Sequence, residues 1–211
     1  MAMRNMVEAL NLALHQSMEN DPDVLVMGED VAVNGGVFRV TLGLLEKYGE
    51  RRVFDTPLAE GGIIGAAVGM AVTGLKPIPE MQFSGFSYQA FHQIEQNAAR
   101  IRNRTRGRYT INMVIRMPYG GGIRAVEHHS ESREAYWAHS PGLKVVIPSS
   151  PRAARALLQG AIDDPDPVVF YEPKAVYRAF REEVPDEVES WPMGKARVVR
   201  EGGDLTVIAF G

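Results

Sequence analysis

The sequence contains no cysteine and no long apolar run. Without cysteine the chain cannot form disulfides, thiolate metal sites or thiol nucleophiles, and the absence fits a reducing compartment. No stretch approaches the roughly 20 apolar residues that cross a bilayer, and the charged, helically spaced N-terminal segment does not resemble a signal peptide. We therefore expect a cytoplasmic protein that does not use a membrane.

A strong charge of one sign is also missing, since the net charge is −3 at pH 7. This balance argues against nucleic acid as a partner. The one basic cluster has a single aromatic neighbour, Tyr109, and comprises Arg100, Arg102, Arg104, Arg106 and Arg108. We interpret it as a solvated helix end, where the helix dipole favours positive charge, and leave open that it docks a partner protein.

Short apolar segments alternate with amphipathic ones as far as residue 173. The spacing predicts strands over 24–28, 52–57, 75–83, 111–118, 144–148 and 167–173, and helices over 3–19, 59–73, 87–104, 131–138 and 150–162. Because the strands are continuously apolar, they match a parallel sheet covered on both faces. The prediction is a doubly wound, mainly parallel α/β domain over residues 1–180, with its ligand site beyond the carboxyl ends of the strands.

Two features qualify this domain. The prolines of 75–83 place part of that strand near an end of the sheet. Residues 181–192 are acidic and are interpreted as a solvated linker. Residues 203–211 have the pattern of a strand, so we interpret 181–211 as a linker and the first strand of a C-terminal domain that is mostly absent.

Glu60 lies between Pro57 and a run of small and apolar residues, which places it at a helix N-terminus. One interpretation is a first-turn carboxylate that interacts with the helix dipole. The other is chemical, because apolar neighbours would exclude water from the carboxyl group, raise its pKa and keep its proton. A buried neutral acid can donate a hydrogen bond to a ring nitrogen.

A long segment, FDTPLAEGGIIGAAVGMAVTGLKPIPEMQF, resembles the beta chain of the decarboxylase component of 2-oxo acid dehydrogenase complexes (pyruvate, branched-chain and acetoin types). The resemblance continues through the blocks GEDV (28–31), GGVF (35–38), RMPYGGG (116–122), HHSES (128–132), AHSPGLKVVIPS (138–149) and PVVFYEPK (167–174). It covers essentially the whole chain, with the blocks in the family's order. It implies a thiamine-diphosphate pyrimidine-binding domain that serves oxidative decarboxylation of a 2-oxo acid.

The resemblance also implies which residues hold the cofactor. Glu60 matches the carboxyl group that pairs with N1′ of the aminopyrimidine and promotes its imino tautomer. Phe86 matches an aromatic that stacks on this ring, Gln82 lies four residues before it, and the backbone of Leu58 helps to hold the ring. Without the resemblance, the phenylalanines of this region would be interpreted as core residues.

His128 and His129 follow a glycine-rich turn. An adjacent pair lacks the i, i+4 spacing of a helical zinc site. By resemblance, His129 is the active-site histidine that serves acyl transfer to a lipoyl group, by donating a proton as the carbon–sulfur bond forms. His128 could contact substrate or cofactor beside it. Asp164 matches a ligand of a structural potassium loop, although an acidic turn that caps a helix is the alternative.

The sequence lacks the Gly-Asp-Gly pattern that marks the diphosphate-binding module of thiamine enzymes. By resemblance, that module is an alpha chain, which holds the diphosphate through a divalent metal, Mg²⁺, in an α2β2 tetramer docked to a lipoyl-bearing acyltransferase core. The small face formed by Gly62, Ala66, Gly69 and Thr73 then serves either contact between chains or close packing within the domain.

Other interpretations stay open. The chain could be a non-catalytic binding or assembly module, since most of the second domain is expected to be absent. A single-chain relative of transketolase would need both modules in 211 residues. A dinucleotide-binding domain would need a GxGxxG after the first strand, which is missing. HHSES and RMPYGGG lean slightly toward branched-chain members, but the sequence predicts only a 2-oxo acid substrate.

Overall fold

A six-stranded sheet forms the centre of the molecule in the computed structural model, which describes residues 1–210. The strand order is β3-β2-β4-β5-β7-β6, and every neighbouring pair runs parallel. The strands are β2 (Val24–Gly28), β3 (Val53–Asp55), β4 (Lys76–Glu80), β5 (Val114–Tyr119), β6 (Lys144–Val146) and β7 (Val168–Pro173). The predicted doubly wound α/β domain is confirmed.

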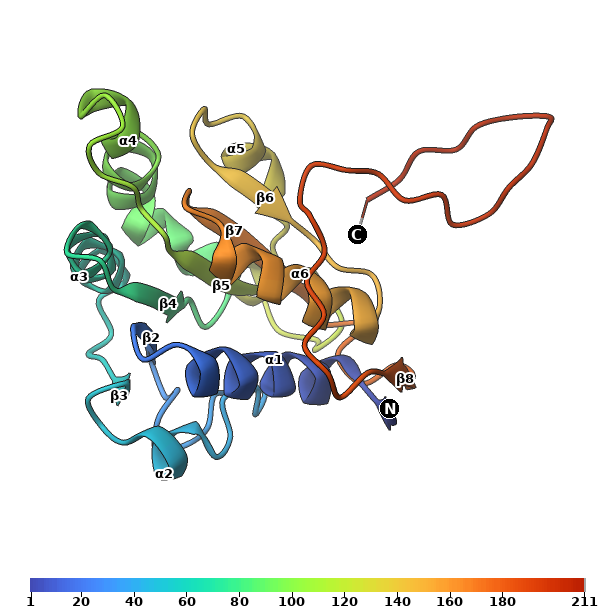
Figure 1. Cartoon of the computed structure of the whole chain (residues 1–211), viewed down its shortest axis with the longest axis horizontal. Coiled ribbons are helices and arrows are strands. Elements are labelled where there is room, and N and C mark those ends of the chain that lie inside the picture. Colours follow the sequence, from blue (N-terminus) through green and yellow to red (C-terminus); the bar gives the residue numbers. More distant parts are fainter. Residues whose placement is uncertain (211) are drawn as a thin grey trace.

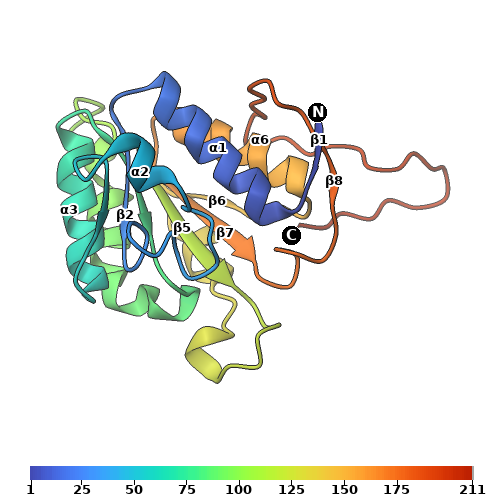
Figure 2. The same ribbon diagram turned by 90° about the horizontal axis from the view of Figure 1, so that it is seen from below.

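Helices cover both faces of this sheet (Figures 1 and 2). On one face α1 (Met6–Asn20) and α6 (Pro151–Asp163) lie side by side, and their apolar residues join one buried cluster with alternate residues of the strands. The other face is covered by α3 (Glu60–Val72), a π-helical segment η2 (His92–Ala98) and α5 (Glu134–Ala138), which share a second cluster. The ends of α1 and α6 are fixed locally, because Asn5 and Ser150 accept N-terminal backbone hydrogen bonds as caps.

The sequence predicted that the prolines place part of β4 near an end of the sheet, and this prediction is wrong. β4 lies centrally between β2 and β5, and its five residues all pair with β2. Successive residues of a strand direct their hydrogen-bonding groups to opposite neighbours, and proline has no N–H to donate. Pro77 and Pro79 therefore weaken only the β5 side, where pairing is confined to Glu80 and Arg116.

The predicted long helix over 87–104 is divided into three pieces. A 3₁₀ segment η1 (Ser84–Ala90) is followed by η2 and by the short α4 (Ile101–Arg104). At two positions the backbone of η1 packs closely against backbone from another part of the chain, and these contacts keep η1 from forming a regular α-helix. A β-carbon on Gly61 of α3 would lie 2.9 Å from the Gln89 carbonyl oxygen, and one on Gly85 would lie 2.2 Å from that of His128. A short helix α2 (Leu44–Tyr48) precedes β3 and ends at Gly49 with φ 77°.

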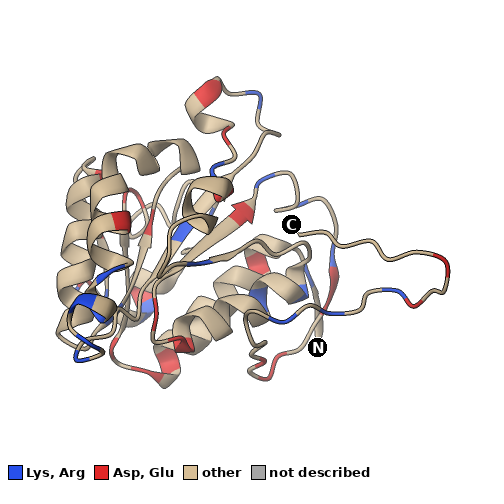
Figure 3. Cartoon of the chain, turned by 90° about the horizontal axis from the view of Figure 1, so that it is seen from above, with Lys and Arg blue, Asp and Glu red and all other residues tan. Residues whose placement is uncertain are grey.

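The segment after residue 180 is a linker only in part. Glu182–Val184 forms strand β8, antiparallel to β1 (Ala2–Arg4), so the chain ends of the domain are joined. Figure 3 shows acidic and basic residues close together in this region, and Asp186 bonds both Arg4 and the N-terminal amine. The strand predicted at 203–211 is not formed over 203–210, and residue 211 lies outside the described residues. Within the described part of the chain, no helix is long and apolar enough to cross a membrane.

Candidate functional site

The sheet reverses its winding direction beside β2. From β2 the chain adds β3 on one side and then β4 on the other, and the crevice at such a switch point is where doubly wound sheets bind ligands. Gly28 ends β2 with φ 152°, and a β-carbon there would lie 2.8 Å from the Glu80 carbonyl oxygen. This close packing directs the residues after β2 and β4 into the same space.

Two acidic side chains meet at this point. Glu60 is the first residue of α3 and is 7% exposed, while Glu29 follows β2 and is 5% exposed. Within residues 1–210 neither oxygen of Glu29 has a hydrogen-bond partner. Burial, the charge of Glu60 and the charge of Asp30 raise the pKa of Glu29 to about 7. The retained proton that the sequence analysis considered for Glu60 stays a prediction, and the raised pKa belongs to its neighbour Glu29.

Asp30 connects the acidic pair to β4. Its backbone is left-handed with φ 59°, which is uncommon for a residue with a side chain. One carboxylate oxygen accepts a hydrogen bond from the Gln82 amide at 2.9 Å, and the other accepts one from Asn34 at 3.0 Å. Asp30 follows Glu29 in the sequence, so its hydrogen bond places Gln82, which was predicted to bind the cofactor, near Glu29.

Aromatic rings and a histidine form the neighbouring wall. The Phe83 ring lies 4.6 Å from the His129 ring between centroids, and the Phe86 ring lies 5.2 Å from it, both edge-on. Phe86 is half-buried and packs against Phe83 at 5.8 Å. The Nδ1 atom of His129 is buried without a partner, whereas His128 is mostly exposed and lies 3.7 Å from Glu131. The structure thus separates the two histidines, and only His129 faces the phenylalanines closely.

A buried ion cluster joins β4, β5 and β7. Arg116 donates two hydrogen bonds to Glu172, at 2.6 and 2.9 Å, and one to Glu80 at 2.7 Å. Tyr177 also donates to Glu172. Burial raises the pKa of Glu80, although Arg116 opposes the shift. Arg116 thus binds one carboxylate from each neighbouring strand and holds β4, β5 and β7 together. Breaking either pair would leave an uncompensated buried charge.

Asp164, the predicted potassium ligand, is already engaged. The Lys144 ammonium lies 2.7 Å from both of its carboxylate oxygens and 3.5 Å from Asp166. Among the residues the structure describes, no group of three or more His, Cys, Asp or Glu side chains could hold a metal ion. The Arg100–Arg108 cluster lies at the exposed end of α4, where Arg102 pairs with Asp166 at 2.6 Å.

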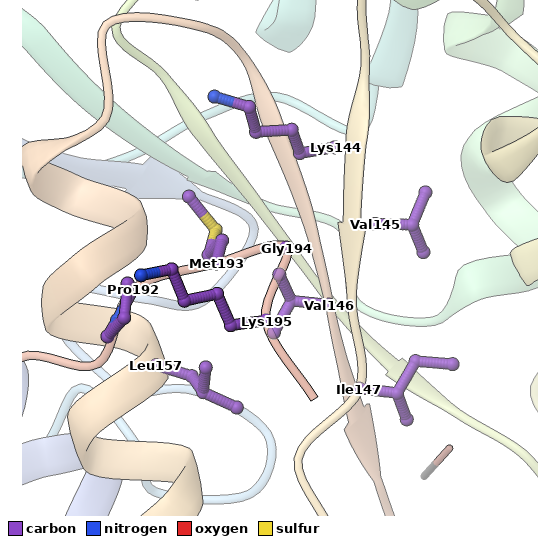
Figure 4. Close-up of a pocket in the computed structure, with 9 residues that line it drawn as sticks. All are labelled: Lys144, Val145, Val146, Ile147, Leu157, Pro192, Met193, Gly194 and Lys195. Carbon is purple, nitrogen blue, oxygen red and sulfur yellow. The ribbon is translucent and has the colours of Figure 1, made fainter. Parts of the chain in front are cut away.

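A cavity of about 400 Å³ lies elsewhere, between β6, α6 and residues 192–195 (Figure 4). Val146, Leu157 and Met193 line it, and none of the predicted cofactor residues does. The predicted site residues therefore lie away from this cavity, near the carboxyl ends of the strands.

The predicted site residues lie on several elements and form two groups. Glu60 begins α3 beside Glu29, and Gln82, between β4 and η1, bonds Asp30, the residue after Glu29. Phe86 in η1 contacts His129 in the segment after β5. Leu58 is 80% exposed in the turn before α3. The sequence analysis missed Glu29 as a site residue, although it stands in the GEDV block directly after a buried strand. Its position at a strand end was the available signal.

The residues present fit an aminopyrimidine ring. The buried carboxyl groups of Glu29, whose oxygens are unpartnered within residues 1–210, and of Glu60 can exchange hydrogen bonds with ring nitrogens, and the half-buried Phe86 supplies an aromatic face. The chain matches the family described as "Transketolase, pyrimidine binding domain" over residues 2–179. The chain belongs to this pyrimidine-binding family.

Two relatives of known name are similar to the chain over nearly its whole length. The chain is 57% identical to the pyruvate dehydrogenase E1 component subunit beta of Acholeplasma laidlawii over its whole length, and 52% identical to that of Mycoplasma genitalium over 98% of it. It spans 64% of the length of each relative. A solved structure titled "Split gene transketolase, inactive beta4 tetramer" matches 79% of this chain and 50% of its own, with a TM-score of 0.64 and 21% identity, which supports the fold alone.

Proposed function

We propose that this pyrimidine-binding domain is the catalytic part of the beta subunit of a pyruvate dehydrogenase decarboxylase, active only with an alpha chain. The buried Glu29 beside Glu60 at the switch point carries the proposal, because a buried acid with a raised pKa is typical of proton-handling sites. The names of the relatives favour pyruvate over the branched-chain acids toward which two sequence blocks leaned.

Thiamine diphosphate, when bound, would supply an acidic thiazolium carbon and an electron sink for decarboxylation. Glu60 would hold a proton at the N1′ atom of the aminopyrimidine. Glu29, whose pKa is raised to about 7 by burial and by the charges of Glu60 and Asp30, would keep a proton beside this site. Phe86 would contact the face of the ring, and the backbone of Leu58 and the amide of Gln82 would limit its movement.

His129 would act in the second half of the reaction, donating a proton to the lipoyl sulfur as the acyl group transfers. Its ring is oriented by Phe83 and Phe86, and its buried Nδ1 has no partner within residues 1–210. The more exposed His128 would contact substrate at the mouth of the site.

The same proposal assigns partners. An alpha chain would bind the diphosphate through Mg²⁺, and a lipoyl-bearing acyltransferase core would receive the acyl group. Gly62, Ala66, Gly69 and Thr73 are exposed on α3, so they do not serve packing within this domain and would suit contact with another chain in an α2β2 tetramer. Potassium at Asp164 would have to displace Lys144, and we leave it out of the proposal. A cytoplasmic location stays a prediction from the sequence.

The test is thiamine-diphosphate-dependent release of carbon dioxide from pyruvate and from branched-chain 2-oxo acids. The chain is assayed alone and then with its cognate alpha chain. Release from pyruvate only in the mixture supports the proposal, and release with branched-chain acids instead would correct the substrate. Turnover by this chain alone would contradict the shared site.

A non-catalytic assembly module is the second candidate, because the chain spans 64% of its relatives and exposes the small face of α3. Binding of the alpha chain without any carbon dioxide release would favour it. Sedimentation of the mixture distinguishes that result from a failure to assemble.

A further inference from the structure

A loop that leaves β5 carries both histidines, and we name residues 120–131 the histidine loop. Most of its residues are exposed, and it begins with three consecutive glycines, two of them at positive φ. Gly120 donates a hydrogen bond to the Glu131 carbonyl at 2.9 Å, which closes the base of the loop. The loop itself packs little apolar area, so its position depends on a few contacts to its backbone.

Three contacts reach backbone carbonyl groups of the histidine loop, those of His128, His129 and Glu131. The His128 carbonyl oxygen approaches Gly85 so closely that a β-carbon would lie 2.2 Å away. The Ser84 hydroxyl donates to the Glu131 carbonyl at 2.8 Å. Between them, the Lys174 ammonium donates to the His129 carbonyl. Lys174 is the only one of the three contacting residues that brings a full charge.

The charge on Lys174 is costly where it lies. The residue follows β7, is 7% exposed, and its ammonium lies 5.0 Å from the centre of the Phe83 ring. Within residues 1–210 it forms no ion pair, since Glu172 nearby in sequence is already bound by Arg116 and Tyr177. Burial lowers the pKa of Lys174 to about 8. A methionine would fill similar space without this penalty, so packing alone does not explain a lysine.

We propose that Lys174 is a positioning residue, whose buried ammonium holds the His129 carbonyl and thereby sets the histidine ring against Phe83 and Phe86. A charged donor makes a stronger hydrogen bond to a carbonyl than a neutral one. The inference rests on the proposed function in one respect, which is that the orientation of His129 matters for proton donation. The clamp itself is a property of the chain without cofactor.

Titration of Lys174 gives the clamp a pH dependence. The titratable and charged side chains on the elements around it are Arg124, Glu127, His128, His129 and Glu131 on the loop, Tyr171 and Glu172 on β7, and Tyr177 and Arg178 on the turn after it. Burial is the cause of the lowered Lys174 pKa, with no charged neighbour contributing. The ammonium is therefore expected to lose its proton near pH 8, while the fold persists and the loop loosens.

Hydrogen–deuterium exchange of the loop tests the proposal in the full chain, free and assembled with its alpha chain. The amides of His129 and Ser130 donate within the loop and report its order. In Lys174→Met they should exchange about tenfold faster than in wild type, which is the effect of losing one charge-assisted hydrogen bond. The matched control is Lys195→Met, at an exposed position, and it should not change their exchange.

The unfolding midpoint separates positioning from general stability. In Lys174→Met it should stay or rise at pH 7, because the penalty of the buried charge is removed. In wild type, loop exchange corrected for its intrinsic pH dependence should accelerate between pH 7 and 9, and the variant should lack this acceleration. Unchanged loop exchange in the variant, or faster exchange spread over the whole chain, would overturn the proposal. If the variant does not fold, the pH series on wild type tests the proposal instead, and a loop whose corrected exchange does not change between pH 7 and 9 would overturn it.

The assembled enzyme supplies a further readout. Lys174→Met should reduce lipoyl acylation more than carbon dioxide release with an artificial electron acceptor, and equal losses would count against positioning of His129. If wild type releases no carbon dioxide with its alpha chain, the proposed function fails while the exchange result still decides the clamp.

Discussion

Replacing Glu29 by glutamine is expected to make the fold more resistant to alkaline pH. Glu29 is 5% exposed and its two carboxylate oxygens have no hydrogen-bond partner, so ionisation places an uncompensated charge beside Glu60. Glutamine has nearly the same size and cannot ionise. The substitution therefore removes the charge and leaves the packing unchanged.

The magnitude follows from the pKa of Glu29, which burial and the charges of Glu60 and Asp30 raise from 4.5 to about 7. Between these values the folded protein binds more protons than the unfolded chain, so the free energy of unfolding falls as pH rises. Linkage over this interval amounts to about 2–3 kcal/mol between pH 5 and pH 8. The loss is nearly complete above pH 7 and small below pH 4.5.

Urea unfolding of wild type, Glu29→Gln and the exposed control Glu46→Gln across pH 5 to 8 measures this effect. The difference between Glu29→Gln and wild type should grow by about 2–3 kcal/mol in favour of the variant as pH rises. Glu46→Gln should follow wild type. A Glu29→Gln curve parallel to wild type at every pH would refute the raised pKa of Glu29 and with it the proton that this residue is proposed to keep.

Three further predictions concern the histidines and the cation loop. Gly85→Ala should destabilise the fold by about 1–3 kcal/mol in urea, because its β-carbon would meet the His128 carbonyl and force the backbones apart; an unchanged midpoint would contradict that contact. Asp164→Asn should cost less than about 1 kcal/mol, since its partner Lys144 is largely solvated, and exchanging sodium for potassium should not shift the wild-type melting temperature; a potassium-specific rise would restore the predicted ion. His129→Ala in the assembled enzyme should impair lipoyl acylation more than decarboxylation with an artificial acceptor, and equal losses would argue against its separate role.

Strong local signals determined which elements sequence could predict. All five residues of β2, Val24–Gly28, are apolar or small and fully buried, so composition predicted both its type and its ends. The helical spacing of α1 was equally visible. The segment after β4 was predicted poorly, because its helical register is broken by tertiary contacts of Gly61 and Gly85 with backbone far away in sequence.

The candidate site shows the same limit. Glu60 was predicted from its place at a helix start and from family resemblance, and the structure buries it. Its acidic neighbour Glu29 was not, since their meeting depends on how β2 and α3 pack at the switch point. Asp164 was predicted by resemblance to bind potassium, and nothing in the sequence connected it with Lys144, which lies 20 residues earlier and bonds it in the structure.

The most direct measurement of the central claim is decarboxylation of pyruvate by the enzyme assembled from the alpha chain and Glu60→Gln. The account predicts a folded, assembled enzyme whose carbon dioxide release falls by at least about a hundredfold, since glutamine cannot hold a transferable proton at N1′. Glu46→Gln, treated in the same way, should retain wild-type activity. Full activity of Glu60→Gln would contradict the assignment of the aminopyrimidine site to this crevice.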